Sequence, residues 1–144
     1  MLLRDLMTHN VQEISPQIPI SEAAQKMRSL DVGALPVCKD GRPIGMLTDR
    51  DITLRAVAAG RDPSQMLVSE AMTPTIVFCY EDDDVREAAQ IMQQKQVRRL
   101  VVLDHDNCPR GIISLGDIAT RAQDEHLSSE VLERVSEAAQ PVPS

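Results

Sequence analysis

Aromatic side chains are almost absent from this sequence of 144 residues, which has one Phe, one Tyr and no Trp. Single-strand nucleic-acid binders and sequence-specific RNA readers stack bases on aromatic rings, and cages for quaternary ammonium groups are built from such rings. With only Phe78 and Tyr80 available, these binding modes are disfavoured. Apolar residues still make up 42% of the chain, so we expect an aliphatic core in one compact domain, or in two small domains that share a core.

An excess of positive charge is also missing, because 15 Lys and Arg residues face 22 Asp and Glu residues, for a net charge of −7. Such a chain repels a phosphate backbone unless it carries a local basic stripe, and the densest basic spot is Arg98-Arg99. No apolar run is long enough to span a membrane, and the first residues lack the pattern of a signal peptide. We therefore expect a cytoplasmic protein that binds neither nucleic acid nor membrane.

Clusters of metal ligands or nucleophiles are not evident. The cysteines and histidines are isolated from one another and lack metal-ligand spacing: Cys38, Cys79, Cys108, His9, His105 and His126. The acidic run at residues 81–84 is interpreted as a capping device at the start of a helix, with a metal site as the alternative. The sequence thus predicts neither a metal site nor a catalytic centre.

What the sequence does contain is an internal repeat. When residues 7–37 are shifted by 65 positions onto residues 72–102, ten of the 31 pairs are identical. After a gap of one residue, the stretch at 45–52 continues the alignment onto 111–118. We therefore expect a first repeat at residues 1–65, a second at 66–123, and a C-terminal amphipathic helix with a disordered tail at 124–144.

Each repeat is predicted to run strand, helix, strand, strand, helix, which gives an α/β (α+β) fold of two β-α-β-β-α units. In the first repeat we expect a short extended piece near 11–14, a helix capped by Ser21 and ended by Gly33, a hairpin of strands 34–38 and 44–48, and a second helix at 49–59. Packing the two sheets about a pseudo-twofold axis would leave two equivalent clefts, so any binding chemistry should appear twice.

One motif recurs where the second hairpin strand enters a helix. It reads Gly45-x-x-Thr48-x-x-Asp51 in the first repeat and Gly111-x-x-Ser114-x-x-Asp117 in the second. Glycine permits a close backbone approach, and a hydroxyl at a helix N-terminus, near free N–H groups, suits phosphate. The aspartate one turn later could accept hydrogen bonds from a ribose diol. The alternative is structural, because Thr48 and Ser114 could be ordinary N-caps with first-turn acids after them.

The repeated pattern resembles the cystathionine-β-synthase (CBS) domain. The resemblance rests on Asp5-Leu6-Met7-Thr8, Gly33-Ala34-Leu35-Pro36-Val37 and residues 45–52, with their echoes in the second half, and it covers about residues 3–122. Two such repeats make a CBS pair, or Bateman module. The chain is similar to small stand-alone bacterial CBS-pair proteins, including the mycobacterial hypoxic-response type, which links it to a stress response.

The resemblance implies regulatory binding of AMP, ADP, ATP or S-adenosylmethionine, with no required cofactor. By that resemblance, Asp51 and Asp117 would hold ribose hydroxyls, and Thr48 and Ser114 would bind ribose or phosphate. The remaining implied positions line the adenine slots or contact phosphate: Val11, Ile76, Pro36, Val101, Arg98 and Arg99. The first repeat has Gly33-Ala34 in place of the two arginines, so we expect unequal clefts, with phosphorylated ligands preferring the one that Arg98 and Arg99 reach.

The family further implies a flat homodimer whose surface would come from Ile52, Val57, Ile118 and Ala122. Three functions stay open. The first is a non-enzymatic nucleotide sensor that acts on an unknown protein partner in trans. The second is a ligand-free interaction module that works through its dimer surface or C-terminal helix. The third is an enzyme, which the sequence disfavours because its candidate polar residues have the character of binders.

Overall fold

The computed structural model describes residues 1–9, 11–74 and 77–121, and within them two repeats of mixed helix and strand form two three-stranded sheets. The chain begins with a short 3-10 helix, η1 (Leu3–Asp5). The first repeat then contains α1 (Ile20–Leu30), β1 (Ala34–Lys39), β2 (Arg42–Thr48), α2 (Asp49–Ile52) and a π-helical turn, η2 (Thr53–Val57). The second contains α3 (Val68–Ala71), β3 (Thr73–Pro74), β4 (Phe78–Tyr80), α4 (Val85–Lys95), β5 (Arg99–Leu103), β6 (Pro109–Ser114) and α5 (Leu115–Arg121).

The predicted hairpins are confirmed in both repeats. Strands β1 and β2 pair antiparallel from Ala34 opposite Thr48 to Lys39 opposite Arg42, and β5 pairs with β6 in the same way. Asp40 and Gly41 take positive φ angles of 53° and 76° at the first turn, the conformation that a two-residue hairpin requires. The extended piece predicted near 11–14 is reduced to one parallel bridge between Ile14 and Val37.

The helix boundaries differ from the prediction in two places. The N-cap of α1 is Pro19, and no side chain caps the helix there, so the prediction of Ser21 as N-cap is wrong. Asp31, with φ of 55°, ends α1 two residues before Gly33. A short polar side chain tolerates this left-handed conformation, and Gln96 repeats it at the end of α4 with φ of 54°.

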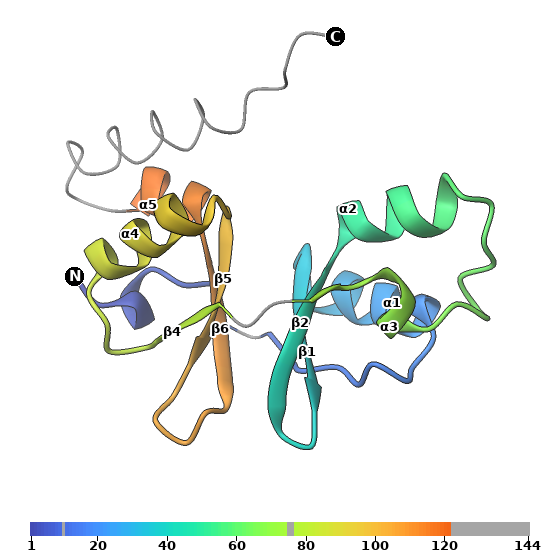
Figure 1. Cartoon of the computed structure of the whole chain (residues 1–144), viewed down its shortest axis with the longest axis horizontal. Helices are drawn as coiled ribbons and strands as arrows, with labels where there is room; N and C mark the ends of the chain where they lie inside the picture. Colours follow the sequence, from blue (N-terminus) through green and yellow to red (C-terminus); the bar gives the residue numbers. More distant parts are fainter. Residues whose placement is uncertain (10, 75–76, 122–144) are drawn as a thin grey trace, which may run out of the picture.

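The two sheets face each other across the middle of the molecule, with helices on their outer sides (Figure 1). The face between the sheets is a small aliphatic cluster drawn from both repeats: Ala34, Met46, Val101, Leu103 and Ile112. Alternate strand residues point the other way, where Leu35 and Leu47 enter the core of the first repeat and Leu100 and Ile113 that of the second. This strict alternation gives each sheet one face for its own helices and one for the other repeat.

The segments that lead into the repeats are exchanged. Leu3, Leu6 and Met7 lie in the hydrophobic core of the second repeat, and Figure 1 shows the N-terminus beside α4. Reciprocally, Met66 and, from α3, Val68 and Ala71 lie in the core of the first repeat. Thr8 bridges to Ile112 of β6, and Thr73 pairs with Met46 of β2. Each repeat therefore completes its core and its sheet with a segment that precedes the other.

Gly45 and Gly111, the glycines that the two repeats share, lie where these exchanged segments cross the sheets. A Cβ at Gly111 would lie 2.7 Å from the carbonyl oxygen of Thr8 and 2.8 Å from the sulfur of Met7. A Cβ at Gly45 would lie 2.7 Å from the carbonyl oxygen of Thr73. The close approach predicted for these glycines is thus an approach of the protein's own backbone.

We expect Gly111→Ala to destabilise the fold by about 1–3 kcal/mol, the usual cost of overpacking a tight contact. The matched control is Gly116→Ala, because the nearest atom to a Cβ there is Ser114 Oγ at 3.6 Å, an ordinary contact. Alanine in place of that helical glycine should be neutral or stabilise by up to about 1 kcal/mol. Chemical denaturation measures both changes, and equal stability of the two variants would contradict the crossing.

The homodimer stays a prediction, but the structure gives the burial of three of the four residues expected on its surface, and Ile52 is half-buried against the first core. Val57 is 65% exposed and Leu54, beside it on η2, is 50% exposed. Ile118 is fully buried in the second core, so its assignment to an outer surface is wrong. Ala122 and the C-terminal helix and tail expected at 124–144 lie outside the described residues. Among the described residues, no helix combines the length and apolar character that a membrane span requires.

Candidate functional site: two clefts between the repeats

Two clefts lie between the repeats. The larger, here called the Thr48 cleft, has a volume of about 530 Å³ and is formed where β2 enters α2, where β3 crosses, and where α4 passes into β5. Its lining residues are Met46, Thr48, Arg50, Asp51, Thr73, Pro74, Gln96, Val97, Arg98 and Arg99. The first repeat supplies the hydroxyl and carboxylate, and the second supplies two arginines.

The second cleft, here called the Ser114 cleft, has a volume of about 210 Å³. It is lined by Thr8, Val11, Asp31, Val32, Gly33, Ala34, Arg99, Ile112, Ser114 and Asp117. Most of these positions correspond to those of the Thr48 cleft under the repeat alignment. The two clefts are therefore built from corresponding positions of the two repeats, as expected, but they differ in volume and in the charges of their linings.

The paired hydroxyl and carboxylate form a reciprocal hydrogen-bonded ring at both sites. In the first repeat the Asp51 N–H donates to Thr48 Oγ1 at 3.1 Å, and the Thr48 N–H donates to Asp51 Oδ2 at 3.0 Å. In the second, the Asp117 N–H donates to Ser114 Oγ at 3.0 Å, and the Ser114 N–H donates to Asp117 Oδ2 at 2.9 Å. Each pair is a capping box. The structural role that the sequence analysis offered as the alternative, an N-cap followed by a first-turn acid, is therefore confirmed.

The capping box leaves part of each side chain available. All four residues are only half-buried, and each hydroxyl that accepts in the ring can still donate its own hydrogen. Within the described residues, Asp51 Oδ1 accepts one long hydrogen bond of 3.3 Å, from the Thr73 hydroxyl. A cap that also borders a cleft can therefore take part in binding without losing its structural role.

The predicted anion site at the helix N-terminus is not formed in the first repeat. The amides of Thr48 and Asp51 are engaged in the ring, that of Arg50 donates to Asp49 Oδ1 at 2.8 Å, and that of Asp49 donates to the Gly33 carbonyl at 2.9 Å. In the second repeat the Leu115 amide likewise donates to the Arg98 carbonyl at 2.8 Å. Because these backbone N–H groups are already bonded within the protein, they are not free to bind an anion.

Arginine side chains bring positive charge to the Thr48 cleft. Arg50, Arg98 and Arg99 are all exposed and line it. In the described part of the chain, the guanidinium groups of Arg98 and Arg99 make no hydrogen bond or ion pair. At the corresponding positions of the Ser114 cleft, Gly33 and Ala34 carry no charge.

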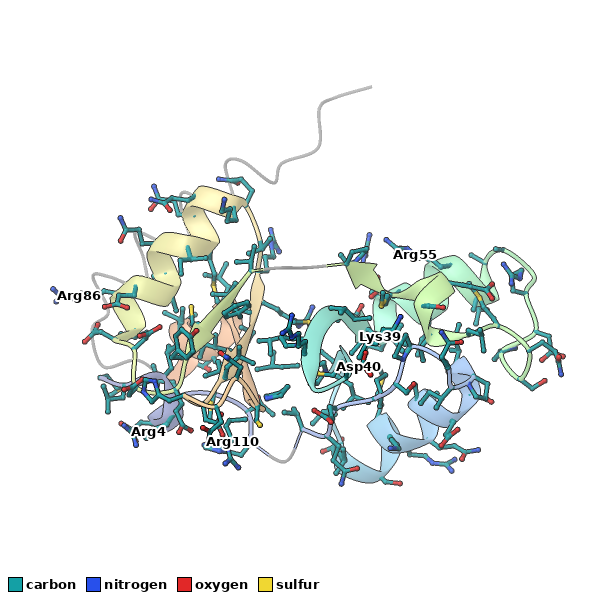
Figure 2. The ribbon with its side chains drawn as sticks, turned by 60° about the horizontal axis from the view of Figure 1, so that its bottom comes forward. Arg4, Lys39, Asp40, Arg55, Arg86 and Arg110 are labelled. Atoms are coloured by element: carbon teal, nitrogen blue, oxygen red, sulfur yellow. The ribbon has the colours of Figure 1, made fainter. Side chains whose placement is uncertain are left out.

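A further arginine fixes the wall of the Thr48 cleft from outside. Arg55 Nη1, on η2, donates to the carbonyl oxygens of Ala71 at 2.8 Å and Met72 at 2.7 Å, and Figure 2 shows Arg55 on the side where α3 and β3 lie. These bonds hold the end of α3 in place directly before Thr73, whose hydroxyl reaches Asp51. No local pattern predicts this contact, because Arg55 and Met72 are 17 residues apart.

The other predicted site residues are distributed between the clefts and the core. Val11 lines the Ser114 cleft. Pro36 and Val101 are buried in strands β1 and β5, and neither is among the residues that line the two clefts. Gly45 and Gly111 lie under the crossing segments, and Ile76 lies outside the described residues.

Sequence reasoning missed several lining residues. Thr8 and Thr73 were visible as an identical pair in the repeat alignment, and Arg50 stands inside the motif itself. Asp31, which lines the Ser114 cleft, could not be placed there until the end of α1 was known.

Burial raises the pKa of the Cys38 and Cys79 thiols to about 12, so neither supplies a thiolate nucleophile at neutral pH.

Comparison with known proteins places this architecture in a family. The CBS domain profile matches residues 3–57 and again residues 68–124. The chain is 41% identical over 134 residues to the CBS domain-containing protein YhcV of Bacillus subtilis, which covers 93% of this chain and 94% of that protein. It is 38% identical over 117 residues to hypoxic response protein 1 of Mycobacterium tuberculosis, with 81% of each chain covered.

A solved structure agrees with these matches. The crystal structure of hypoxic response protein I with two coordinated zinc ions superposes with a TM-score of 0.69 at 36% identity, over 84% of this chain and 98% of that one. In the part of the chain described here, no three His, Cys, Asp or Glu side chains are grouped as a metal site would need. Two consecutive matches to one domain, on a duplicated fold, mean that this protein belongs to the CBS domain family as a tandem CBS pair.

Proposed function

We propose that this CBS pair is a non-enzymatic regulatory module that binds adenosine-containing ligands in its two clefts and acts on a separate protein. The observation that carries the proposal is the duplicated constellation of a hydroxyl and a carboxylate at each cleft, with arginines added on one side. The ligands considered are AMP, ADP, ATP and S-adenosylmethionine, and no other cofactor is required.

The carboxylates suit a ribose. Asp51 and Asp117 each use one oxygen in the capping ring and border a cleft that the other repeat closes. A carboxylate held in this way can accept hydrogen bonds from both hydroxyls of a vicinal diol. Because the ring fixes the side-chain rotamer, little conformational entropy is lost when the diol binds.

The walls of the clefts suit a purine even though the chain has only two aromatic rings. The apolar lining of the Ser114 cleft consists of Val11, Val32, Ala34 and Ile112, and that of the Thr48 cleft consists of Met46, Val97 and Pro74. Aliphatic and thioether groups can sandwich a flat ring and exclude water from its faces. The arginines of the Thr48 cleft would then meet the phosphates, since guanidinium groups pair with phosphate oxygens in a bidentate manner.

Thermal unfolding tests the proposal with AMP, ADP, ATP and S-adenosylmethionine. A ligand at 100 times its Kd stabilises by about 2.7 kcal/mol, which for a chain of this size raises Tm by about 5–10 °C. Asp51→Asn with Asp117→Asn keeps an acceptor for each capping ring but removes both charges, so the shift should fall sharply. Asp40→Asn on the distal hairpin makes the same chemical change away from both clefts and should retain the shift. No shift with any of the four ligands at millimolar concentration would contradict nucleotide sensing.

A second candidate function is a ligand-free interaction module, which the exposed apolar side chains of Leu54 and Val57 favour. The same surface supports the proposal that the chain forms a homodimer. This alternative predicts that a partner recovered from cell extract binds equally well with and without nucleotide, and equally well to the Asp51→Asn, Asp117→Asn variant. Partner binding that changes with nucleotide only in the native chain supports the sensor.

A further inference from the structure

One charged side chain belongs to both clefts. Arg99 lines the Thr48 cleft together with Arg50 and Arg98, and it also lines the Ser114 cleft opposite Asp31 and Asp117. Of the described residues it is the one shared by the two linings, whereas its neighbour Arg98 lines only the Thr48 cleft. The position of this guanidinium therefore contributes to the electrostatics of both sites.

The strand geometry explains why Arg99 occupies this place. Arg99 opens β5 on the strand face that carries Val101 and Leu103 toward the other sheet. Its counterpart in the first repeat is Ala34, which opens β1 and lies in the aliphatic cluster between the sheets. The pseudo-twofold arrangement would allow two such side chains, but alanine at one of the two positions leaves a single guanidinium between the clefts.

The two clefts differ in how much their charge depends on Arg99. The Thr48 cleft has three arginines against Asp51, and so keeps an excess of positive charge even without Arg99. Among the described residues that line the Ser114 cleft, Arg99 is the one positive side chain, and Asp31 and Asp117 are the acids. When Arg99 turns away, the charged side chains that remain in the described lining of that cleft are the two carboxylates.

We propose that Arg99 couples the two clefts negatively for phosphorylated ligands, a property that rests on the proposed nucleotide binding. A guanidinium can make its paired, fork-like hydrogen bonds to one phosphate at a time. A phosphate bound beside Arg98 in the Thr48 cleft holds Arg99 there, and the Ser114 cleft then opposes a second phosphate with two carboxylates. Coupling between sites is typically 5- to 150-fold and is reciprocal, and we expect about 10-fold for ATP.

The coupling is measured by comparing the second binding step before and after the first cleft is disabled. Calorimetric titration of ATP should show two steps in the native chain. In Asp51→Ala, which removes the carboxylate of the Thr48 cleft, ATP should bind the Ser114 cleft about 10-fold more tightly than in the weaker step of the native chain. Adenosine, which lacks phosphate, should show a much smaller difference.

Two neighbouring arginines provide the decisive comparison. In an Arg99→Ala background, adding Asp51→Ala should no longer change the affinity of the Ser114 cleft. In an Arg98→Ala background the difference should persist, because Arg98 does not line that cleft. Both arginines are exposed, so both variants should fold, which thermal unfolding verifies.

The outcomes separate the coupling from the function on which it rests. Equal affinities of the Ser114 cleft with and without Asp51→Ala in the native background would overturn the coupling and leave nucleotide binding intact. A difference that persists in Arg99→Ala would assign it to repulsion between the ligands and overturn the role of Arg99. Absence of any binding step in the native chain would contradict both the coupling and the proposed function.

Discussion

Replacing both Arg98 and Arg99 by alanine is expected to weaken ATP binding to the Thr48 cleft by about 100-fold. A hydrogen bond to a charged group contributes about 1.5–3 kcal/mol, and each 1.4 kcal/mol is a tenfold change in affinity. Both guanidinium groups line this cleft and are free of protein partners within the described residues, so no internal ion pair competes for them. The backbone amides at the start of α2 cannot compensate, because they are already bonded.

Titration calorimetry with ATP measures this loss, and adenosine provides the internal reference. Adenosine should bind with nearly unchanged affinity, because the removed groups would meet only phosphate. The control variant is Arg28→Ala with Arg42→Ala, which changes the net charge equally at exposed positions outside both clefts. If the control weakens ATP binding as much as the cleft variant does, the effect comes from net charge, and the phosphate role of Arg98 and Arg99 is wrong.

Leu3→Ala is expected to cost about 2–5 kcal/mol of stability, although Leu3 stands near the start of the chain. Its side chain is fully buried in the core of the second repeat, and truncating a buried leucine removes transfer energy and leaves a cavity. The Leu3 amide also donates to the Asp83 carbonyl at 3.0 Å, which ties η1 to the residues before α4. At about 2–4 °C per kcal/mol, Tm should fall by about 5–15 °C.

The matched comparison is Leu35→Ala, the same change at a fully buried position in the core of the first repeat. Both variants should lose stability to a similar extent in denaturant unfolding. A large loss for Leu35→Ala with no loss for Leu3→Ala would show that the leading segment does not belong to the second core. The exchange of segments between the repeats would then be incorrect.

The repeat alignment explains how much of this fold could be anticipated. The spacing of 65 residues carries over to the structure, where Asp31 and Gln96 end equivalent helices and Ala34 and Arg99 open equivalent strands. Alternation in the strands separates residues such as Leu35, which enters its own core, from Ala34, which faces the other repeat. Local pattern is sufficient for these features because each depends on neighbours within one repeat.

The exchanged segments could not be anticipated in the same way. Met7-Thr8 and Met72-Thr73 are identical in sequence, and nothing local in them indicates which sheet they join. The choice depends on contacts between residues far apart in the chain, such as Thr8 with Ile112. The repeats are therefore units of sequence, whereas each core is completed by residues from the other half.

The site shows a comparable limit. Thr48 and Asp51 were identified from their spacing, but the spacing that suits a ribose is also the spacing of a capping box. Only the hydrogen bonds show that the ring consumes the amides that were expected to hold phosphate. The arginines then become the phosphate ligands of the proposal, and the lack of their counterparts at Gly33 and Ala34 becomes the main difference between the clefts.

The most direct test of the central proposal is calorimetric titration of an adenosine nucleotide into protein that has been freed of nucleotide by unfolding and refolding. The account predicts saturable binding of ATP that adenosine competes for, and that the combined Asp51→Asn, Asp117→Asn change removes. Titrations of AMP, ADP, ATP and S-adenosylmethionine that all give no saturable heat, in protein shown to be folded, would contradict it.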